Sequence, residues 1–173
     1  MRRTDVDRVH TTLDSPLGEL TLVATPEGAL TGLYVCEQRY LPESYTFGER
    51  DDEAFADVAQ QLAEYFEGRR REFTVPVDPR GTPFQRAVWD ELRAIPYGGT
   101  TTYGALAVRV GAPTAARAVG AANGRNPISL IVPCHRVLGS TGSLRGYASG
   151  MERKLWLLEL EGAPLSRSSG GSR

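Results

Sequence analysis

Residue types that build disulfide frameworks and zinc sites are scarce in this chain. Its 173 residues include two cysteines and two histidines. Cys36 lies in an apolar stretch, whereas Cys134 stands beside a histidine and an arginine, so their settings do not suggest a disulfide framework. His10 and His135 make no familiar zinc-site spacing with these cysteines, so we predict that no metal is bound.

Long apolar runs are also missing. No stretch reaches the ~18 apolar residues that a membrane-spanning helix needs, and residues 1–7 lack the apolar core of a secretory signal. A reducing cytoplasm is the natural compartment for a working thiol. We therefore expect a cytoplasmic protein without membrane contact. The length is sufficient for one domain or two small ones.

The net charge of −1 hides an asymmetry between the two halves. Residues 1–79 hold 8 basic and 16 acidic side chains, whereas residues 80–161 hold 10 basic and 5 acidic ones. This distribution is compatible with a polyanionic partner for the second half. Many domains have lopsided charge without such a partner, so charge alone does not predict nucleic-acid binding.

The first half of the chain predicts a small α+β unit. Alternation of apolar side chains indicates strands, a Thr-Pro-Glu-Gly turn joins two of them, and apolar side chains at helical spacing indicate a helix. The predicted elements are strands at 17–24 and 30–35, a loop at 37–52, a helix at 55–66 and a short edge strand at 73–77. Nothing in this half indicates chemistry.

The second half predicts a mostly helical unit. We place domain boundaries to give an N-terminal domain at 1–78, a C-terminal domain at 79–165 and a disordered tail at 166–173. Thr82 is suited to be the N-cap and Pro83 the first residue of its opening helix. The later predicted helices lie at 103–110, 115–123 and 151–160, the last with Met151, Leu155 and Leu158 on its buried side.

Two of these short helices, joined by a Gly-Ala-Pro turn, read as a helix-turn-helix. The second of them is nearly bare, since small residues surround Arg117, its one long side chain. A bare helix can approach another surface closely, either a neighbouring helix or a groove. The whole pattern predicts an α+β fold. A small N-terminal domain with antiparallel sheet and helix precedes a mostly helical C-terminal domain with a winged-helix-like helix-turn-helix.

One stretch combines several reactive groups. In Ile131-Val132-Pro133-Cys134-His135-Arg136, a strand-like apolar run stops at a proline, and a thiol, an imidazole and a guanidinium follow. The thiolate is the nucleophilic form of cysteine, and basic or cationic neighbours increase its population. Most free cysteines are simply small buried apolar residues, a reading that fits Cys36 better than Cys134.

This stretch resembles the active site of the O6-alkylguanine-DNA alkyltransferases, also called methylated-DNA–protein-cysteine methyltransferases. The similarity runs from about Thr82 to Gly162, while residues 1–81 match only in general layout. The further matching segments are Tyr103-Gly104-Ala105-Leu106-Ala107, Ala115-Ala116-Arg117-Ala118-Val119-Gly120, Asn126-Pro127 and Gly146-Tyr147. In this order and spacing they make the resemblance specific.

The resemblance implies a DNA repair protein that binds the minor groove and flips out the damaged nucleotide. It would transfer the alkyl group from O6-alkylguanine, and also from O4-alkylthymine, irreversibly to Cys134. The implied catalytic residues are Cys134, His135, Glu161, Tyr103 and Asn126. The implied DNA-binding residues are Arg117, Ala115, Ala116, Ala118, Gly120, Thr114 and Arg136. The implied pocket residues are Tyr147, Ala148, Ser149, Val137, Asn123 and Pro133.

The resemblance also implies a role for each catalytic group. His135 takes the thiol proton through a bridging water, and Glu161 orients the imidazole. Tyr103 protonates guanine at N3, and Asn126 braces the turn before the nucleophile. Backbone carbonyls of Cys134 and Val137 would accept hydrogen bonds from the guanine amine.

A thioether product is not reversed by anything in this chain, so we expect one turnover per molecule and no cofactor. The implied partner is double-stranded DNA carrying O6-alkylguanine. We expect a monomer in solution and leave clustering along DNA open. The family usually has at least one glycine where Ala148 and Ser149 stand, so the range of alkyl sizes stays open.

Three other functions fit parts of the pattern. A cysteine hydrolase would need His135 directly on the thiol and gives the helix-turn-helix no role. A transcriptional regulator would carry several polar base contacts on its reading helix rather than alanines. A non-catalytic lesion-binding relative would have the same architecture but lack the cysteine that Cys134 supplies.

Overall fold

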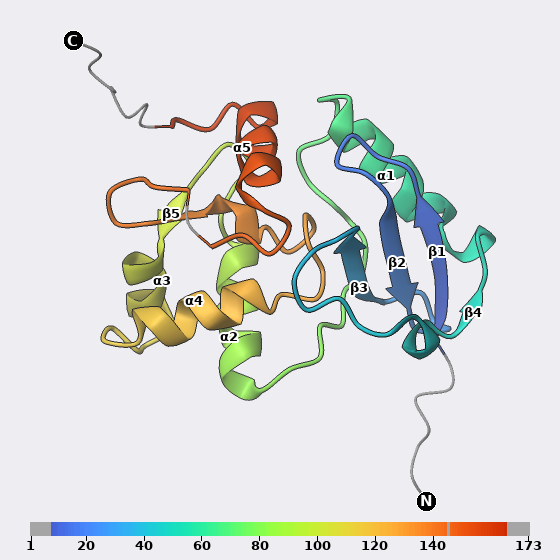
Figure 1. Cartoon of the computed structure of the whole chain (residues 1–173), viewed down its shortest axis with the longest axis horizontal. Coiled ribbons are helices and arrows are strands. Elements are labelled where there is room, and N and C mark those ends of the chain that lie inside the picture. The colour runs from blue at the N-terminus through green and yellow to red at the C-terminus, as the bar shows by residue number, and fades with distance from the viewer. Residues whose placement is uncertain (1–7, 145, 166–173) are drawn as a thin grey trace, which may run out of the picture.

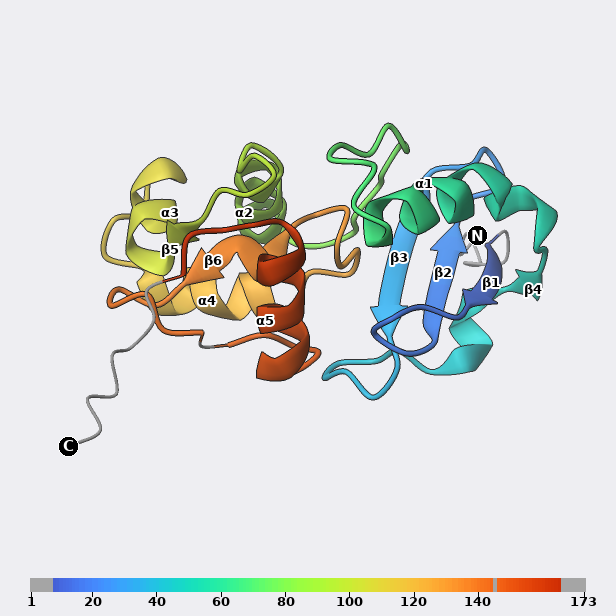
Figure 2. The ribbon, with the colours of Figure 1, turned by 90° about the horizontal axis from the view of Figure 1, so that it is seen from above.

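A computed structural model describes residues 8–144 and 146–165 of the chain. A sheet-containing half and a helical half lie side by side, and the final helix lies near the border between them (Figures 1 and 2). The predicted tail at 166–173 lies outside the described residues.

The first half is a four-stranded sheet covered by one helix (Figure 2). The strands are β1 (Val9–Leu13), β2 (Leu20–Ala24), β3 (Leu30–Val35) and β4 (Glu49–Arg50), in the spatial order β3-β2-β1-β4. Helix α1 (Ala56–Phe66) buries Val58, Leu62 and Tyr65, which lie three or four residues apart and so share one helix face. The sheet is antiparallel except that β4 runs parallel to β1, so it is mixed, which the sequence did not indicate.

The second half is built from four helices and one small strand pair. The helices are α2 (Pro83–Arg93), α3 (Tyr103–Arg109), α4 (Ala116–Gly124) and α5 (Met151–Leu160). The two strands are β5 (Thr101–Thr102) and β6 (Val137–Leu138), which run parallel. Helices α3 and α4 form the predicted helix-turn-helix, and Trp89 on α2 donates its indole N–H to the Ala122 carbonyl of α4 at 2.9 Å.

The outer edge of β3 connects the two halves. The Leu33 N–H donates to the Pro127 carbonyl at 2.8 Å, and the Ser129 N–H donates to the Leu33 carbonyl at 3.1 Å. Edge strands carry unpaired backbone groups, and these bonds satisfy them with a segment of the other half. That segment leads directly to Cys134, so the sheet fixes where the turn that carries Cys134 begins.

Most predicted elements of the first half are present, with three differences. The predicted edge strand at 73–77 is wrong, since only an isolated bridge joins Val77 to Leu30. Pro76 has no N–H to donate, and the Thr74 N–H bonds instead to the Gln61 side chain at 3.0 Å. Strand β1 was missed because its sequence, VHTTL, is mostly polar. The predicted loop at 37–52 also contains the short strand β4.

Helix α2 begins as its sequence predicts. The Thr82 hydroxyl accepts from the Gln85 N–H at 3.1 Å, and the Gln85 side chain accepts from the Thr82 N–H at 3.0 Å. Two N–H groups that the helix itself cannot satisfy are thereby paired.

Replacing Thr82 with alanine removes one of these bonds. We expect Thr82→Ala to lower the free energy of unfolding by about 1 kcal/mol, measured by urea denaturation. Thr82→Ser should retain wild-type stability, and equal losses in both variants would contradict the cap.

Candidate active site

Cys134 begins a single turn of 3-10 helix, Cys134–Arg136, and its side chain is only 3% exposed. The strand predicted just before it is absent, because residues 128–132 form a tight turn instead. Within this turn Leu130 has a φ of 73°, and the Val132 N–H donates to the Ile128 carbonyl at 3.0 Å. The apolar run that was predicted to be a strand is therefore a compact buried turn, and its backbone groups form hydrogen bonds with nearby residues of the chain.

Two buried asparagines hold this turn. Asn126 donates its side-chain amide to the Val132 carbonyl at 2.7 Å and accepts from the Ile128 N–H at 3.0 Å. These are the side-chain-to-backbone bonds expected of it. Asn123, at the end of α4, donates to the Cys134 carbonyl at 3.3 Å. The position of the thiol is thus fixed from both sides.

The next residue, His135, belongs to a buried hydrogen-bond network around Glu161. Nε2 of His135 lies 2.8 Å from Oε2 of Glu161, and both side chains are fully buried. Burial lowers the pKa of His135, opposed by the Glu161 carboxylate, so the imidazole is neutral near pH 7. Its other nitrogen, Nδ1, is buried and has no hydrogen-bond partner among the described residues. A neutral ring with one nitrogen oriented and the other open is suited to accept a proton.

Arg136, which was predicted to contact DNA, is buried in this structure. Its guanidinium is directed into the protein, where Nε and Nη2 donate to the Glu161 carboxylate at 2.8 and 3.0 Å. Nη1 donates to the Ile95 carbonyl at 2.7 Å. Burial alone would raise the pKa of Glu161, but the bonds from His135 and Arg136 outweigh it and lower the pKa to about 2. Arg136 therefore keeps the carboxylate ionised.

The thiol itself is protonated in the resting protein. Burial raises the pKa of Cys134, and Asn126 and the Lys154 ammonium act against that rise. Lys154 is fully buried on α5 and donates to the Val137 carbonyl at 2.5 Å. Burial lowers its pKa to about 8, opposed by Cys134. A buried cation near the thiol would stabilise the thiolate once a proton has left.

The buried side of α5 differs from the one predicted. The helix buries Lys154, Leu157 and Leu158, whereas Met151 is 57% exposed. A lysine on a helix is normally assigned to the solvent side, so nothing in the sequence pattern singled out Lys154. The carbonyls of Cys134 and Val137, expected to accept from guanine, each already accept one hydrogen bond. Each retains a second acceptor site.

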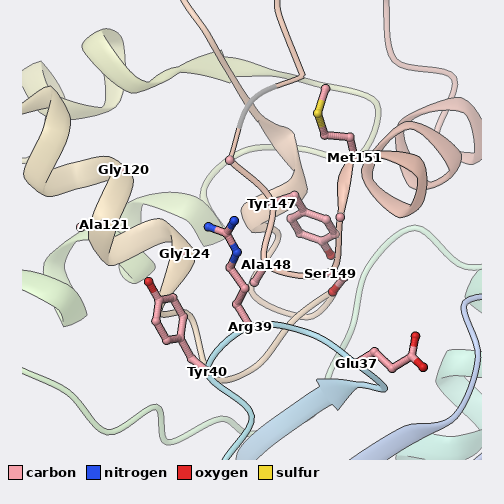
Figure 3. A pocket seen from close by; sticks show the side chains of 12 residues that line it. Glu37, Arg39, Tyr40, Gly120, Ala121, Gly124, Tyr147, Ala148, Ser149 and Met151 are labelled. Carbon is pink, nitrogen blue, oxygen red and sulfur yellow. The ribbon is translucent and has the colours of Figure 1, made fainter.

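A cavity of about 530 Å³ lies beside α4 (Figure 3). Of the predicted substrate residues, Tyr147, Ala148 and Ser149 line it, whereas Asn123 and Val137 do not. Pro133 lines a separate cavity of about 210 Å³. The walls of the larger cavity come from α4, from the loop before α5 and from the segment after β3: Gly120, Ala121, Gly124, Gly146, Tyr147, Ala148, Ser149, Gly150, Met151, Glu37, Arg39 and Tyr40.

Tyr103 lies next to this cavity. A Cβ atom on Gly146, whose φ is 76°, would come within 2.9 Å of the Tyr103 hydroxyl, so glycine is required there by both conformation and space. Burial and then the nearby Cys134 raise the pKa of Tyr103 to about 12, opposed by a hydrogen bond with Asn123. Tyr103 therefore remains a proton donor at neutral pH.

Helix α4 has one exposed side and one packed side. Val119, Ala122 and Asn123 are buried against the rest of the domain. Thr114, Arg117 and Ala118 are exposed, and Ala115, Ala116 and Gly120 are half-buried. The residues predicted to contact DNA on this helix are thus on its accessible side.

The N-terminal half supports the loop that carries the cavity residues. The Arg39 N–H donates to the Ala148 carbonyl at 3.0 Å. Arg153 on α5 donates to the Cys36 carbonyl at 2.8 Å and to the Ser149 carbonyl at 3.2 Å. In Figure 3 the Arg39 side chain points toward the space between α4 and Tyr147. The contacts of Cys36 and Arg39 were missed because they join segments more than a hundred residues apart.

The prediction that the first half carries no chemistry is also incomplete. Tyr65 on α1 is fully buried and donates its hydroxyl to Oε2 of Glu161 at 2.6 Å. The apolar spacing that predicted this helix did not include Tyr65, and its partner could not be predicted either, since Glu161 lies 96 residues away.

Two further findings concern binding sites. Within residues 8–144 and 146–165, no three His, Cys, Asp or Glu side chains gather as a metal ion would need. In the same part of the chain, no helix has the length and apolar character to span a membrane.

Together, these features define a two-domain α+β protein with a buried, hydrogen-bonded thiol beside a helix-turn-helix. Family comparison agrees with that description. Residues 83–163 match the "6-O-methylguanine DNA methyltransferase, DNA binding domain", and residues 9–79 match the "6-O-methylguanine DNA methyltransferase, ribonuclease-like domain". The chain belongs to the methylated-DNA–protein-cysteine methyltransferase family.

Individual relatives agree over most of the length. A methylated-DNA–protein-cysteine methyltransferase of Mycobacterium bovis is 53% identical over 152 residues, covering 88% of this chain and 91% of that protein. A constitutive one of Bacillus subtilis is 42% identical over 156 residues, covering 88% and 94%. The crystal structure of Mycobacterium tuberculosis OGT in complex with DNA is 51% identical, with a TM-score of 0.83 over 92% of this chain and 96% of that one.

The buried network predicts a large effect of neutralising Glu161. In Glu161→Gln the Arg136 charge stays buried without its partner, which should cost about 3–5 kcal/mol of unfolding free energy. The folded pKa of about 2 lies below the ordinary value, so this carboxylate stabilises the protein above about pH 4.3 and loses that effect as pH falls toward 2.

Urea denaturation at pH 7 and pH 3 measures both effects. The wild type should lose more stability than Glu161→Gln between these pH values. Glu159→Gln, on the exposed side of α5, is the matched control and should behave as the wild type. Equal stability of all three proteins at pH 7 would show that the buried pair contributes nothing.

Proposed function

We propose that this protein repairs DNA by moving the alkyl group of O6-alkylguanine, and of O4-alkylthymine, onto Sγ of Cys134. The observation that supports this most directly is the buried Cys134 followed by a neutral His135 that the ionised Glu161 orients. The ring of His135 meets that of Tyr147, a residue of the cavity bordered by α4, at a centroid distance of 6.5 Å. Membership of the methyltransferase family supports the same reaction.

The proposed reaction is an in-line displacement. A water bridging Sγ and Nδ1 of His135 lets the imidazole take the thiol proton, and Glu161 stabilises the resulting imidazolium. The thiolate attacks the alkyl carbon, the carbon–O6 bond breaks, and the bonding electrons remain on guanine. Tyr103 donates a proton at N3, so guanine leaves without a negative charge. The S–C bond is stable, so each molecule acts once and needs no cofactor.

DNA recognition follows from the shape of α4. Small side chains on its exposed side fit a minor groove about 6 Å wide. Arg117, the long cation on that side, fills the space left by the extruded nucleotide. Few polar side chains on α4 face outward, which suits damage recognition in any sequence and disfavours a sequence-reading regulator.

The alternatives fit less well. A hydrolase would use His135 with a direct bond to the thiol, whereas Nδ1 of His135 has no hydrogen-bond partner among the described residues. A non-catalytic lesion-binding protein has no use for Cys134 and its relay. We propose further that the protein acts as a monomer in the cytoplasm on chromosomal duplex DNA; whether molecules cluster there is a separate question.

Intact-protein mass tests the proposed acceptor. After mixing with a duplex containing O6-methylguanine, the wild type should gain the mass of one methyl group. Cys134→Ser should gain none, because a hydroxyl is far less ionised than a thiol near pH 7, while still binding the duplex. Cys36→Ser is the matched control and should react normally. Peptide mapping that finds the methyl group on Cys36 would disprove the assignment.

A second measurement tests the role of Arg117. If its side chain replaces a flipped base, Arg117→Ala should slow repair of a duplex at least about tenfold more than reaction with free O6-methylguanine base, because only the duplex requires extrusion. A phosphate contact would instead weaken binding to any DNA and reduce the salt dependence by about one unit. Equal slowing on duplex and free base would rule out the intercalation role.

A further inference from the structure

The hydrogen bonds around Glu161 include one from outside the C-terminal half. Oε2 of Glu161 accepts from the Tyr65 hydroxyl at 2.6 Å and from Nη2 of Arg136 at 3.0 Å, and Nε2 of His135 lies 2.8 Å away. Oε1 accepts from Nε of Arg136 at 2.8 Å. Tyr65 is thus bonded to the same oxygen atom that orients the proposed base.

Packing around its ring holds the Tyr65 hydroxyl in place. Tyr65 lies on the buried side of α1, three residues after Leu62. Its ring contacts Phe73 at a centroid distance of 5.2 Å and meets the Tyr97 ring edge-on at 6.2 Å. Aromatic contacts on both sides leave the ring little freedom. The hydroxyl can therefore hold one direction of approach to Oε2.

The hydroxyl also remains a donor at every working pH. Burial, followed by the negative charge of Glu161, raises the pKa of Tyr65 far above its ordinary value. A phenol that stays protonated withdraws electron density from the carboxylate oxygen it contacts. Charge on that oxygen is what stabilises the imidazolium form of His135.

We infer that Tyr65 is a positioning residue of the active site, through which the N-terminal domain sets the basicity and orientation of His135 by way of Glu161. This inference rests on the proposed function of His135 as the base for Cys134. It gives the sheet domain a part in the chemistry, although that domain contributes no group that touches the reacting atoms.

A test of this role should change one group near His135 and leave the other titratable and charged groups around it unchanged. The titratable and charged groups that face His135 and Glu161 from the surrounding elements are Tyr65 on α1, Cys134 and Arg136 in the nucleophile turn, Lys154 on α5 and Tyr147 in the cavity loop. Of these, Tyr65 can lose its polar atom while keeping its ring, since phenylalanine has the same shape.

The experiment compares Tyr65→Phe with Tyr97→Phe. The Tyr97 hydroxyl donates to the carbonyl of Leu160, next to Glu161, at 3.2 Å. Each variant therefore loses one hydroxyl at the end of α5, but only Tyr65→Phe loses a donor to the carboxylate. Thermal unfolding confirms that both variants are folded.

The first readout is the imidazole itself. The chain has two histidines, so the ¹⁵N spectrum of histidine-labelled protein is simple, and His10 provides an internal reference. We expect the titration of His135 to move to higher pH in Tyr65→Phe and to stay unchanged in Tyr97→Phe. This measurement requires no alkyl transfer.

The second readout is the single-turnover rate on a duplex with O6-methylguanine, measured across pH. Tyr65→Phe should be about fivefold slower, the loss expected for one hydrogen bond, and its acid limb should move to higher pH.

An unmoved His135 titration, a pH-independent loss of rate, or the same changes in Tyr97→Phe would each overturn the role of Tyr65. Failure of the wild type to accept a methyl group would instead overturn the proposed function, and the histidine titration would still decide the role of Tyr65.

Discussion

The Glu161 carboxylate is the interaction on which this site depends. A buried negative charge is costly unless donors surround it, and here three side chains from two halves of the protein supply them. The network fixes the ring of His135, occupies the guanidinium of Arg136 and joins α1 to the end of α5. The network that joins α1 to the end of α5 therefore also orients the imidazole of His135.

The sheet has a second, purely mechanical part. Its β3 edge pairs with residues 127–129, which begin the nucleophile turn, and the segment after β3 bonds to the loop that lines the cavity. The reactive thiol and the cavity wall are both held against a rigid sheet. Accurate placement of reacting groups lowers activation barriers, which explains why a domain without chemistry of its own accompanies the helical one.

Local signals predicted much of this from sequence. Thr82 and Pro83 marked the start of α2, helical spacing located α1, and a short motif singled out Cys134 and His135. Glu161 came only from the family resemblance. Prediction failed where tertiary contacts decide. Arg136 and Lys154 look like surface cations until the carboxylate and carbonyls that bury them are known. Tyr65 looks like an ordinary core aromatic, and the run before Pro133 has the composition of a strand although asparagine side chains satisfy its backbone.

The pairing of the β3 edge has a consequence for folding while the chain is being synthesised. During synthesis the sheet emerges from the ribosome first. Residues 76–78 pair with its β3 edge at Leu30, but the residues that pair with Leu33 follow almost a hundred positions later. Until then the nascent sheet presents bare backbone donors and acceptors, a known template for wrong pairing with other chains. The N-terminal half is thus at greatest risk of aggregation while the chain is incomplete, and the arrival of the nucleophile segment ends that exposure.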